Sequence, residues 1–333
     1  MATPDPSKPT VDNSVYAIGS IIQLKVTPDA ISGNEATTLQ VKVEKQQSPW
    51  TLSCCMIVEI QRTPENIPGL STGDEVFLKM FDRRFAEQIR EDNGIEPWSE
   101  AFEQDFAKDL ASGKVEKFLE KLRTVPNFKD DTEEDWDNAE NEAYLASALQ
   151  QYFDAETATY ARLQQYQGRA IPRLLAPVAL RETTATSGLG QGQETQMIPR
   201  FLASMVLDDT PSNEVLSTQQ RKLKEHKGIV DEAVQKVHFL GDYNILNKDV
   251  RPVNFIVVPK NGAYRVFMID FGQCRFRRKD ETDAELGRAK RDQDEEGAVA
   301  LVMEMRLKRV GFELQYEQSP RYSEWARGEF DYD

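Results

Sequence analysis

The chain opens with short segments in which apolar and polar residues alternate. Residues 20–26 and 37–43 follow this period of two and are rich in β-branched residues. Two more apolar segments follow at 52–60 and 75–81, with a Pro- and Gly-containing stretch at 64–73 between them. Alternation of this kind places one side of a strand in a core. The pattern therefore predicts an antiparallel β-rich block at the start of the chain.

From about residue 83 to residue 167 the pattern changes to the three- and four-residue spacing of helices. The segment 101–122 carries apolar residues at helical spacing, and 138–165 predicts one or two long helices. The acidic run at 130–137 suits a helix start, where carboxylates meet the positive end of the helix dipole. The later segments predict two strands, a helix, a hairpin and a last helix: 174–180, 198–207, 217–240, 255–258 with 265–269, and 295–310.

The length of 333 residues allows one large domain or two small ones. The chain has 41 Lys and Arg against 56 Asp and Glu, and the net charge of −15 repels phosphate backbones and anionic lipid. We therefore expect neither a nucleic-acid nor a membrane partner. No apolar run reaches the ~20 residues of a spanning helix. Residues 1–14 lack the features of a signal peptide, so a cytoplasmic or nuclear location is expected.

Cysteine and histidine are scarce, which limits the possible chemistry. Cys54 and Cys55 are adjacent and Cys274 is far away, so no disulfide framework is expected. The two histidines, His226 and His238, are too few for the usual Cys/His metal sites and leave a hydrolase triad as a weak alternative. This pattern favours a reducing, intracellular environment.

The segment 247–272 carries the strongest chemical signal. Asp249 and Asn254 lie five residues apart around a basic residue and a proline, and an apolar hairpin separates them from Asp270-Phe271-Gly272. In these residues the sequence resembles the protein-kinase-like superfamily, with the first pair in the catalytic loop and the triplet at the metal site. The alternative is an exposed Asp and Asn on a turn beside a core hairpin.

The resemblance implies a role in phosphoryl transfer for each of these residues. Asp249 accepts the proton of the acceptor hydroxyl, and Arg251, where most protein kinases have lysine, keeps a positive charge near the transferred group. Asn254 and Asp270 supply hard oxygen ligands to Mg²⁺ between nucleotide phosphates. Gly272 gives the backbone freedom to turn directly after the metal ligand.

Upstream, the resemblance extends to a lysine and a glutamate. Lys79, in the predicted strand 75–81, corresponds to the lysine that holds the α- and β-phosphates, although a strand lysine is ordinarily only solubilising. Its partner is expected to be a glutamate on the next long helix. We choose Glu156, with Glu142 as the rival, and an exposed helix carboxylate is the alternative for either.

The segments that would contact the nucleotide directly give a weaker signal. By strand order, 46–54 covers the phosphates, but it lacks the glycines of a phosphate-binding loop. Ser48, Thr51 and Ser53 could donate hydroxyls instead, and the missing glycines predict weaker ATP binding than in a typical protein kinase. The adenine hinge falls near 203–208, around Met205, where backbone groups make the contacts.

A wider similarity points to a fungal family of protein-kinase-domain proteins over about residues 15–325. It rests on the segments 78–85, around Trp98, 156–172, 247–254, 269–278, 294–299 and 319–322. The family resemblance implies a bilobal kinase fold with ATP in its cleft, and it gives no acceptor.

Two charged groups near the catalytic segment remain open to two interpretations. The basic cluster at 275–278 either pairs with the neighbouring Asp280 and Glu281 or binds a phosphate or an acidic acceptor. Asp294 and Glu295 either brace the catalytic loop from the following helix or simply cap that helix.

The sequence as a whole predicts an α+β, bilobal, protein-kinase-like fold. A tail at 1–14 precedes a β-rich N-lobe at 15–203, which contains a helical insert at about 83–140, and a short helical C-lobe covers 204–333. The predicted function is ATP- and Mg²⁺-dependent phosphoryl transfer to a protein Ser or Thr hydroxyl.

Two alternatives to this function stay open. The few residues after the Asp-Phe-Gly triplet suggest a small-molecule acceptor. The missing glycines, together with Asn247 where the family has histidine, suggest a nucleotide-binding pseudokinase that acts as a binding module.

Overall fold

The computed structural model describes residues 14–26, 37–47, 49–63, 67, 69–180, 201–206, 223–260 and 263–327. By their internal contacts, the residues form two compact units. Unit 1 comprises Met1–Phe153 with Leu174–Val206, and unit 2 comprises Asp154–Arg173 with Leu207–Asp333. Each unit is described by itself below.

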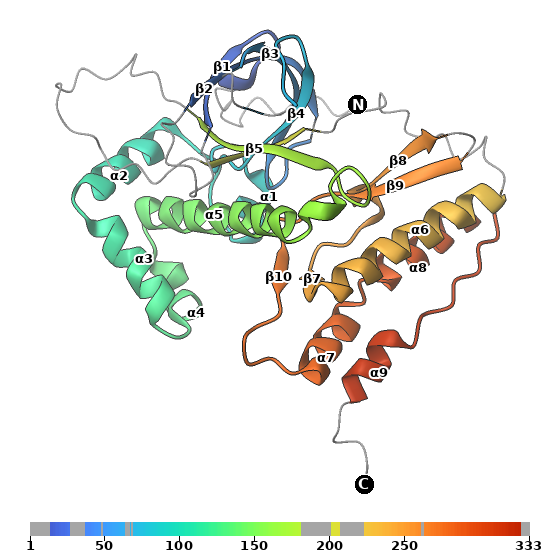
Figure 1. Ribbon diagram of the computed structural model, residues 1–333. Coiled ribbons are helices and arrows are strands. Elements are labelled where there is room, and N and C mark those ends of the chain that lie inside the picture. Colours follow the sequence, from blue (N-terminus) through green and yellow to red (C-terminus); the bar gives the residue numbers. More distant parts are fainter. Residues whose placement is uncertain are drawn as a thin grey trace. The chain divides into compact units, whose positions relative to one another are not determined.

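Unit 1 is built on a closed β-barrel of antiparallel strands, labelled in Figure 1. The strands are β1 (Ile21–Val26), β2 (Thr37–Gln47), β3 (Cys54–Arg62), β4 (Glu75–Met80), β5 (Arg173–Leu180) and β6 (Phe201–Val206). Their order around the barrel is β1-β2-β3-β4-β6-β5, and β1 closes it by pairing with β5 in the register Lys25 to Ala179. The alternating segments at the start of the chain thus form the strands predicted for them.

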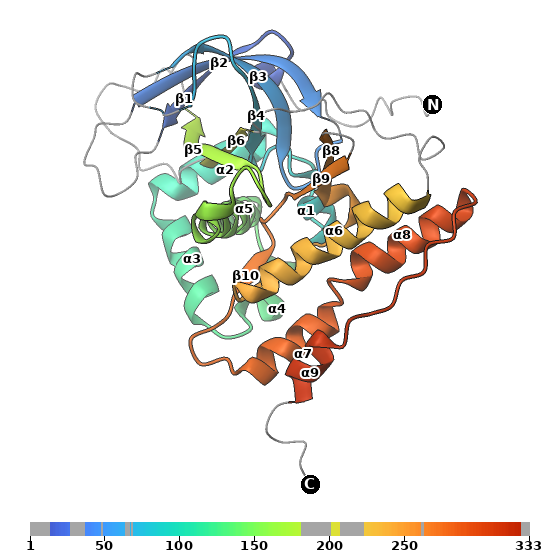
Figure 2. The same cartoon turned by 45° about the vertical axis from the view of Figure 1, so that its right-hand side comes forward.

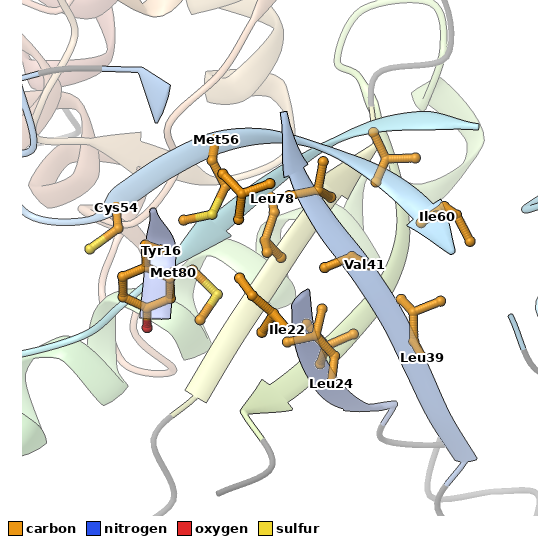
Figure 3. Close-up of a cluster of buried hydrophobic side chains, with 14 of the residues drawn as sticks. Tyr16, Ile22, Leu24, Leu39, Val41, Cys54, Met56, Ile60, Leu78 and Met80 are labelled. Carbon is orange, nitrogen blue, oxygen red and sulfur yellow. The ribbon is translucent and has the colours of Figure 1, made fainter. Parts of the chain in front are cut away.

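The apolar residues of these alternating strands fill the inside of the barrel. In β3, for example, Cys54, Met56, Val58 and Ile60 are all fully buried, whereas the residues between them are partly exposed. Figure 3 shows these side chains meeting those of the neighbouring strands, with Tyr16 at one end of the core. Burial of this apolar surface is the main force that closes the barrel.

The helical insert of unit 1 is built from several short helices that precede the long helix α5. The helices of unit 1 are α1 (Glu87–Asp92), α2 (Glu100–Ala111), α3 (Lys114–Thr124), α4 (Phe128–Thr132) and the first part of α5 (Asn138–Arg162). The helical segment 101–122 forms α2 and α3, which are separated at Gly113 with its left-handed φ of 74°. The acidic run does provide a helix start, since the Asp137 carboxylate accepts a hydrogen bond from the Glu140 N–H at 2.9 Å.

Unit 2 is mainly helical. Its elements after α5 are α6 (Leu223–Asp242), β7 (Ile245–Asn247), β8 (Phe255–Lys260), β9 (Ala263–Met268), β10 (Cys274–Phe276), α7 (Asp283–Gln293), α8 (Gly297–Arg309) and α9 (Arg321–Arg327). The predicted hairpin is β8–β9, and a second two-stranded sheet pairs β7 with β10. Helices α7 and α9 lie side by side (Figure 2), and a Cβ atom at Gly287 would come within 2.6 Å of the Trp325 side chain.

These elements confirm the predicted α+β fold class. One unit rests on a curled antiparallel sheet and the other is mainly helical around a hairpin. Within the described ranges, no helix has the length and apolar character needed to cross a membrane.

Candidate active site

The predicted catalytic loop in unit 2 is a short, internally hydrogen-bonded segment between β7 and β8. The Asp249 N–H donates to Asn247 Oδ1 at 2.9 Å, and Asn254 Nδ2 donates to the Asp249 carbonyl at 2.7 Å. The Asn254 N–H donates to the Arg251 carbonyl at 2.9 Å. These bonds close the loop on itself and hold Asp249 and Asn254 in a defined relation.

The Asp249 carboxylate is 14% exposed and lies beside a cation. Arg251 Nη2 is 2.5 Å from Asp249 Oδ2, and Asn254 Nδ2 is 3.4 Å from the same oxygen. The Arg251 side chain is 57% exposed, so it can turn toward a ligand in solvent. The loop thus offers one carboxylate and one positive charge together.

Asp270 follows β9 and is joined to the same loop. The N–H of Ile269 donates to the Asn254 carbonyl at 2.9 Å, which places Asp270 next to Asn254. Asp270 itself has a left-handed φ of 65°, whereas Gly272 is not among the positive-φ glycines of the described chain. Aspartate can adopt a left-handed φ because its short polar side chain tolerates it. The turn expected at Gly272 is present, and the Cys274 N–H closes it by donating to the Phe271 carbonyl at 3.0 Å.

Tyr160 on helix α5 and Cys274 in β10 lie near Asp270, and sequence analysis did not predict either as part of the site. Phe271 is fully buried, and its ring meets that of Tyr160 edge-on at 5.4 Å between centroids. Burial raises the pKa of Tyr160 well above its usual value, and the carboxylates of Glu156 and Asp270 raise it further. Burial also raises the pKa of Cys274, with Glu156 and Asp270 again contributing. Glu156 and Asp270 thus face the same buried cluster.

A buried ion pair between Lys290 and Glu295 supports the loop through its backbone. Glu295 Oε1 accepts a hydrogen bond from the Asn247 N–H at 2.7 Å, and its other oxygen pairs with Lys290 Nζ. Burial lowers the pKa of Lys290 and raises that of Glu295. Asp294 instead caps α8 by accepting from the Gly297 N–H at 3.1 Å. Of the two interpretations of this acidic pair, bracing of the loop therefore applies to Glu295 and capping of the helix applies to Asp294.

Lys79 lies in unit 1 on the outer face of the barrel. It is 4% exposed, stands opposite Cys55 in the β3–β4 ladder, and its ammonium is 5.0 Å from the centre of the Phe81 ring. A buried lysine is uncommon and points to a role beyond solubility.

The rival glutamate Glu142 has other partners in unit 1. Its carboxylate is 2.7 Å from Arg90 Nη2 and 3.1 Å from Arg83 Nη1, and it is 1% exposed. Arg83 also binds Glu103 at 2.8 Å. Glu142 therefore belongs to a charge network that ties α5 to the insert, and Glu156 stays the predicted partner of Lys79.

The predicted phosphate and adenine segments are described in part. Ser48 and the side chain of Met205 lie outside the described residues, and the backbone of Met205 belongs to β6. Thr51 is exposed, and its carbonyl accepts from the Gln88 N–H at 3.2 Å. The Ser53 hydroxyl lies 3.6 Å from the Cys55 sulfur.

The basic cluster at 275–278 is largely used in ion pairs. Arg275 forms two hydrogen bonds to the Glu281 carboxylate, each 2.8 Å long, and Arg277 pairs with Asp283. The hydrogen bond from Arg275 lowers the pKa of Glu281 to about 2. Arg278 is the exposed member of the cluster.

The donors of the loop suit a magnesium ion that also binds phosphate. Asn254 uses its amide nitrogen on the Asp249 carbonyl, which leaves the amide oxygen as a candidate ligand. The carboxylate of Asp270, the residue after Ile269, is the second candidate. Within the part of the chain that the structure describes, no group of three or more His, Cys, Asp or Glu side chains could hold a metal alone. Mg²⁺ typically binds through one or two protein oxygens together with nucleotide phosphates, which fits this pair.

Comparison with known proteins gives structural neighbours only. No family model and no curated protein matches the chain. Solved structures that resemble it include the "ROP18 kinase domain in complex with AMP-PNP and sucrose", with 13% identity and a TM-score of 0.38 over 80% of this chain; the match spans 59% of that chain. Another is the kinase domain of a Toxoplasma gondii specific rhoptry antigen, with 14% identity and a TM-score of 0.38, covering 95% of this chain and 75% of that one. Both of these neighbours are kinase domains.

Proposed function

We propose that this chain is a kinase-like phosphotransferase that uses ATP and Mg²⁺ and transfers the γ-phosphoryl group to a protein Ser or Thr hydroxyl. The observation that carries the proposal is the hydrogen-bonded loop that holds Asp249 and Asn254 beside Asp270. Phosphoryl transfer needs positioning and charge stabilisation from the protein more than covalent chemistry. A carboxylate, a cation and two oxygen donors in one loop meet that need.

In this proposal Asp249 is the catalytic base. The acceptor oxygen bonds to the γ-phosphorus while its proton passes to Asp249, and the bond from the γ-phosphorus to the bridging oxygen breaks, with its electron pair leaving on ADP. Arg251, which lies beside Asp249, offers positive charge to the transferred group. Asn254 and Asp270 would hold Mg²⁺, which neutralises phosphate charge when bound.

The nucleotide contacts complete the proposed site. Lys79 binds the α- and β-phosphates and Glu156 orients it. The hydroxyls of Ser48, Thr51 and Ser53 donate to the phosphates. The backbone around Met205 binds adenine. ATP is the proposed partner of the chain, and the acceptor is a protein hydroxyl. The relation to a fungal family of protein-kinase-domain proteins stays a prediction.

A nucleotide-binding module without turnover is the second candidate. Asn247 stands where the kinase family has histidine, and its amide nitrogen is buried with no hydrogen-bond partner among the described residues. Buried polar groups are usually hydrogen-bonded, so this amide is an uncommon feature of the loop. In this second candidate the loop supports nucleotide binding without turnover.

The test measures phosphate transfer from γ-labelled ATP with Mg²⁺ to a generic protein substrate and, separately, to a library of small hydroxyl compounds. We expect Asp249→Asn to lower transfer about 10²–10⁴-fold, the usual effect of a general base. Asp231→Asn is the matched control, because this exposed carboxylate lies on α6 and pairs with Lys227 of the same helix. Labelling of the library alone would move the acceptor to a small molecule. Nucleotide binding without any transfer would favour the binding module and contradict the enzyme.

A further inference from the structure

The loop between β2 and β3 is held by aromatic rings. Its described residues, Pro49–Ser53, contain no glycine. The Trp50 ring meets Phe85 at 5.4 Å and Tyr16 at 6.0 Å between centroids, with interplanar angles of 84° and 89°. Tyr16 and Phe85 meet each other at 5.2 Å. These edge-to-face contacts are the favourable geometry for aromatic pairs, and we call the three rings the aromatic clasp.

The clasp rests on a buried polar anchor. Tyr16 is fully buried, and its hydroxyl donates to Asp82 Oδ2 at 2.8 Å. Asp82 is also buried and pairs with Arg84, whose Nη2 lies 2.6 Å from the same carboxylate. Arg84 in turn lies over the Phe85 ring, 5.4 Å from its centre. The Tyr16 ring of the clasp is therefore fixed by a hydrogen bond to Asp82, and the ion pair with Arg84 holds that carboxylate.

The backbone around the loop is tied to the same structure. Gln46, near the end of β2, donates its side-chain amide to the Tyr16 carbonyl at 2.7 Å. The indole N–H of Trp50 reaches the Cys55 carbonyl at 3.4 Å. The Gln88 N–H donates to the Thr51 carbonyl at 3.2 Å. These hydrogen bonds therefore fix the end of β2, the start of β3 and the middle of the loop.

The held loop leads directly to the proposed phosphate lysine. Cys55, at the start of β3, is the cross-strand partner of Lys79, and Cys54 is the partner of Met80. Directly opposed residues of an antiparallel pair point to the same face of the sheet. Whatever fixes residues 49–53 therefore fixes the backbone next to Lys79.

We propose that Trp50 is a positioning residue that places this loop for the triphosphate of the nucleotide. A glycine-rich loop is flexible and must be ordered when it binds phosphate, whereas a loop already packed through Trp50 is ordered before the ligand arrives. Ordering before binding lowers the entropic cost of association. The inference rests on the proposed function. Aromatic packing positions this loop, whose described residues include no glycine.

The test compares the affinity of the full chain for Mg·ATP and for adenosine by titration calorimetry. Adenosine lacks phosphates, so it reports on the nucleotide site without the loop. We expect Trp50→Ala to weaken Mg·ATP binding roughly tenfold and adenosine binding less than twofold, because two aromatic contacts of the loop are lost. Trp50→Phe retains a ring and should keep most of the Mg·ATP affinity.

Trp136→Ala is the matched control. This residue is also a half-buried tryptophan in an aromatic cluster, but its partners are Phe118, Phe128 and Tyr144 in the insert. We expect it to change neither affinity, even if it lowers the melting temperature. Equal weakening of both ligands by Trp50→Ala, or no weakening at all, would overturn the inference while the wild-type protein still binds ATP.

A second measurement needs no nucleotide. Amide hydrogen exchange of the peptide that contains residues 49–55 should be slow in the wild-type chain and at least tenfold faster in Trp50→Ala. Unchanged exchange would overturn the role of Trp50. A wild-type chain that binds no nucleotide but shows the exchange difference would overturn the proposed function, and the ligand role of the clasp with it, while leaving the loop anchoring established.

Discussion

Lysine and glutamate side chains are seldom fully buried, yet Lys290 and Glu295 are buried as a pair directly beneath the proposed catalytic loop. Their burial has a cost that only their mutual attraction and further hydrogen bonds offset. Glu295 uses its second oxygen on the Asn247 N–H, so the pair also fixes the backbone just before Asp249. At the scale of single residues, the proposed site thus depends on buried charges that fix its backbone and do not themselves bind a ligand.

Removal of one member of this pair should destabilise the protein strongly. Lys290→Met leaves Glu295 buried without its cation, and we expect the free energy of unfolding in urea to fall by about 3–5 kcal/mol. The double variant Lys290→Met with Glu295→Leu removes both charges and should recover part of that loss. A fall of less than about 1 kcal/mol for Lys290→Met would show that the pair is not an energetic support.

Glu281 gives a pH-dependent prediction. Its hydrogen bond from Arg275 lowers its pKa from 4.5 to about 2. A carboxylate whose pKa is lowered by folding stabilises the protein fully above its unfolded pKa and loses that contribution as the pH falls through its folded pKa. The contribution of Glu281 should therefore decline between about pH 4.5 and pH 2.

The measurement is the free energy of urea unfolding at a series of pH values, for wild type and Glu281→Gln. A single proton taken up on unfolding gives a slope of up to about 1.4 kcal/mol per pH unit, and the variant should lack this part. Glu120→Gln is the control, since this glutamate is an exposed residue of α3. Identical slopes for wild type and Glu281→Gln would contradict the prediction.

At the scale of elements, helix α5 carries two buried glutamates with different neighbours. Glu142, in the part that belongs to unit 1, binds Arg90 and Arg83. Glu156, in the part that belongs to unit 2, faces the cluster around Tyr160 and Cys274. The two positions are about four helical turns apart at 3.6 residues per turn, so both lie on the same side of α5 although their partners differ.

Substitution of the two glutamates should separate stability from nucleotide binding. We expect Glu142→Ala to cost about 3–5 kcal/mol of unfolding free energy, because two buried arginines lose their common partner, and to leave ATP affinity within about twofold. Glu156→Ala should instead weaken ATP binding about tenfold if it orients Lys79 through a charge-assisted contact. Thermal unfolding and calorimetric titration test both variants, and a reversed pattern would make Glu142 the residue of the site.

At the scale of the whole molecule, the net charge of −15 acts on the entire fold. Some basic residues near the site are paired with neighbouring carboxylates, as Arg275 is with Glu281. The excess negative charge is therefore carried by acidic side chains elsewhere in the chain. Like charges repel in the compact state, and dissolved salt screens this repulsion.

Salt should therefore stabilise this protein. Screening worth about 1 kcal/mol raises the melting temperature by about 2 °C in a chain of this size. The measurement is the melting temperature at low and at physiological NaCl concentration, with a neutral osmolyte at matched osmolarity as the control. A melting temperature that falls with salt would mean that favourable ion pairs, such as Arg83 with Glu103, outweigh the overall repulsion.

Several features that the sequence predicted correctly are local in the chain. The strands of the barrel follow from alternation within β1 to β4. The close relation of Asp249 and Asn254 follows from a spacing of five residues that one loop can span. The three-residue strands β7 and β10 were missed, because so few residues carry no detectable period. The break at Gly113 was missed because a single glycine within a helical pattern is often tolerated.

Sequence alone determined the fold class, the barrel strands and the composition of the proposed catalytic loop, because periodicity and short-range spacing encode them. Tertiary structure decided which charged and aromatic side chains contact one another: Lys290 with Glu295, Glu142 with its two arginines, and Trp50 with Tyr16 and Phe85. Each of these groups joins different elements of the fold, and nothing in local propensity distinguishes one acidic or aromatic residue from the next. Their partners follow only from how the packed elements bring distant segments together.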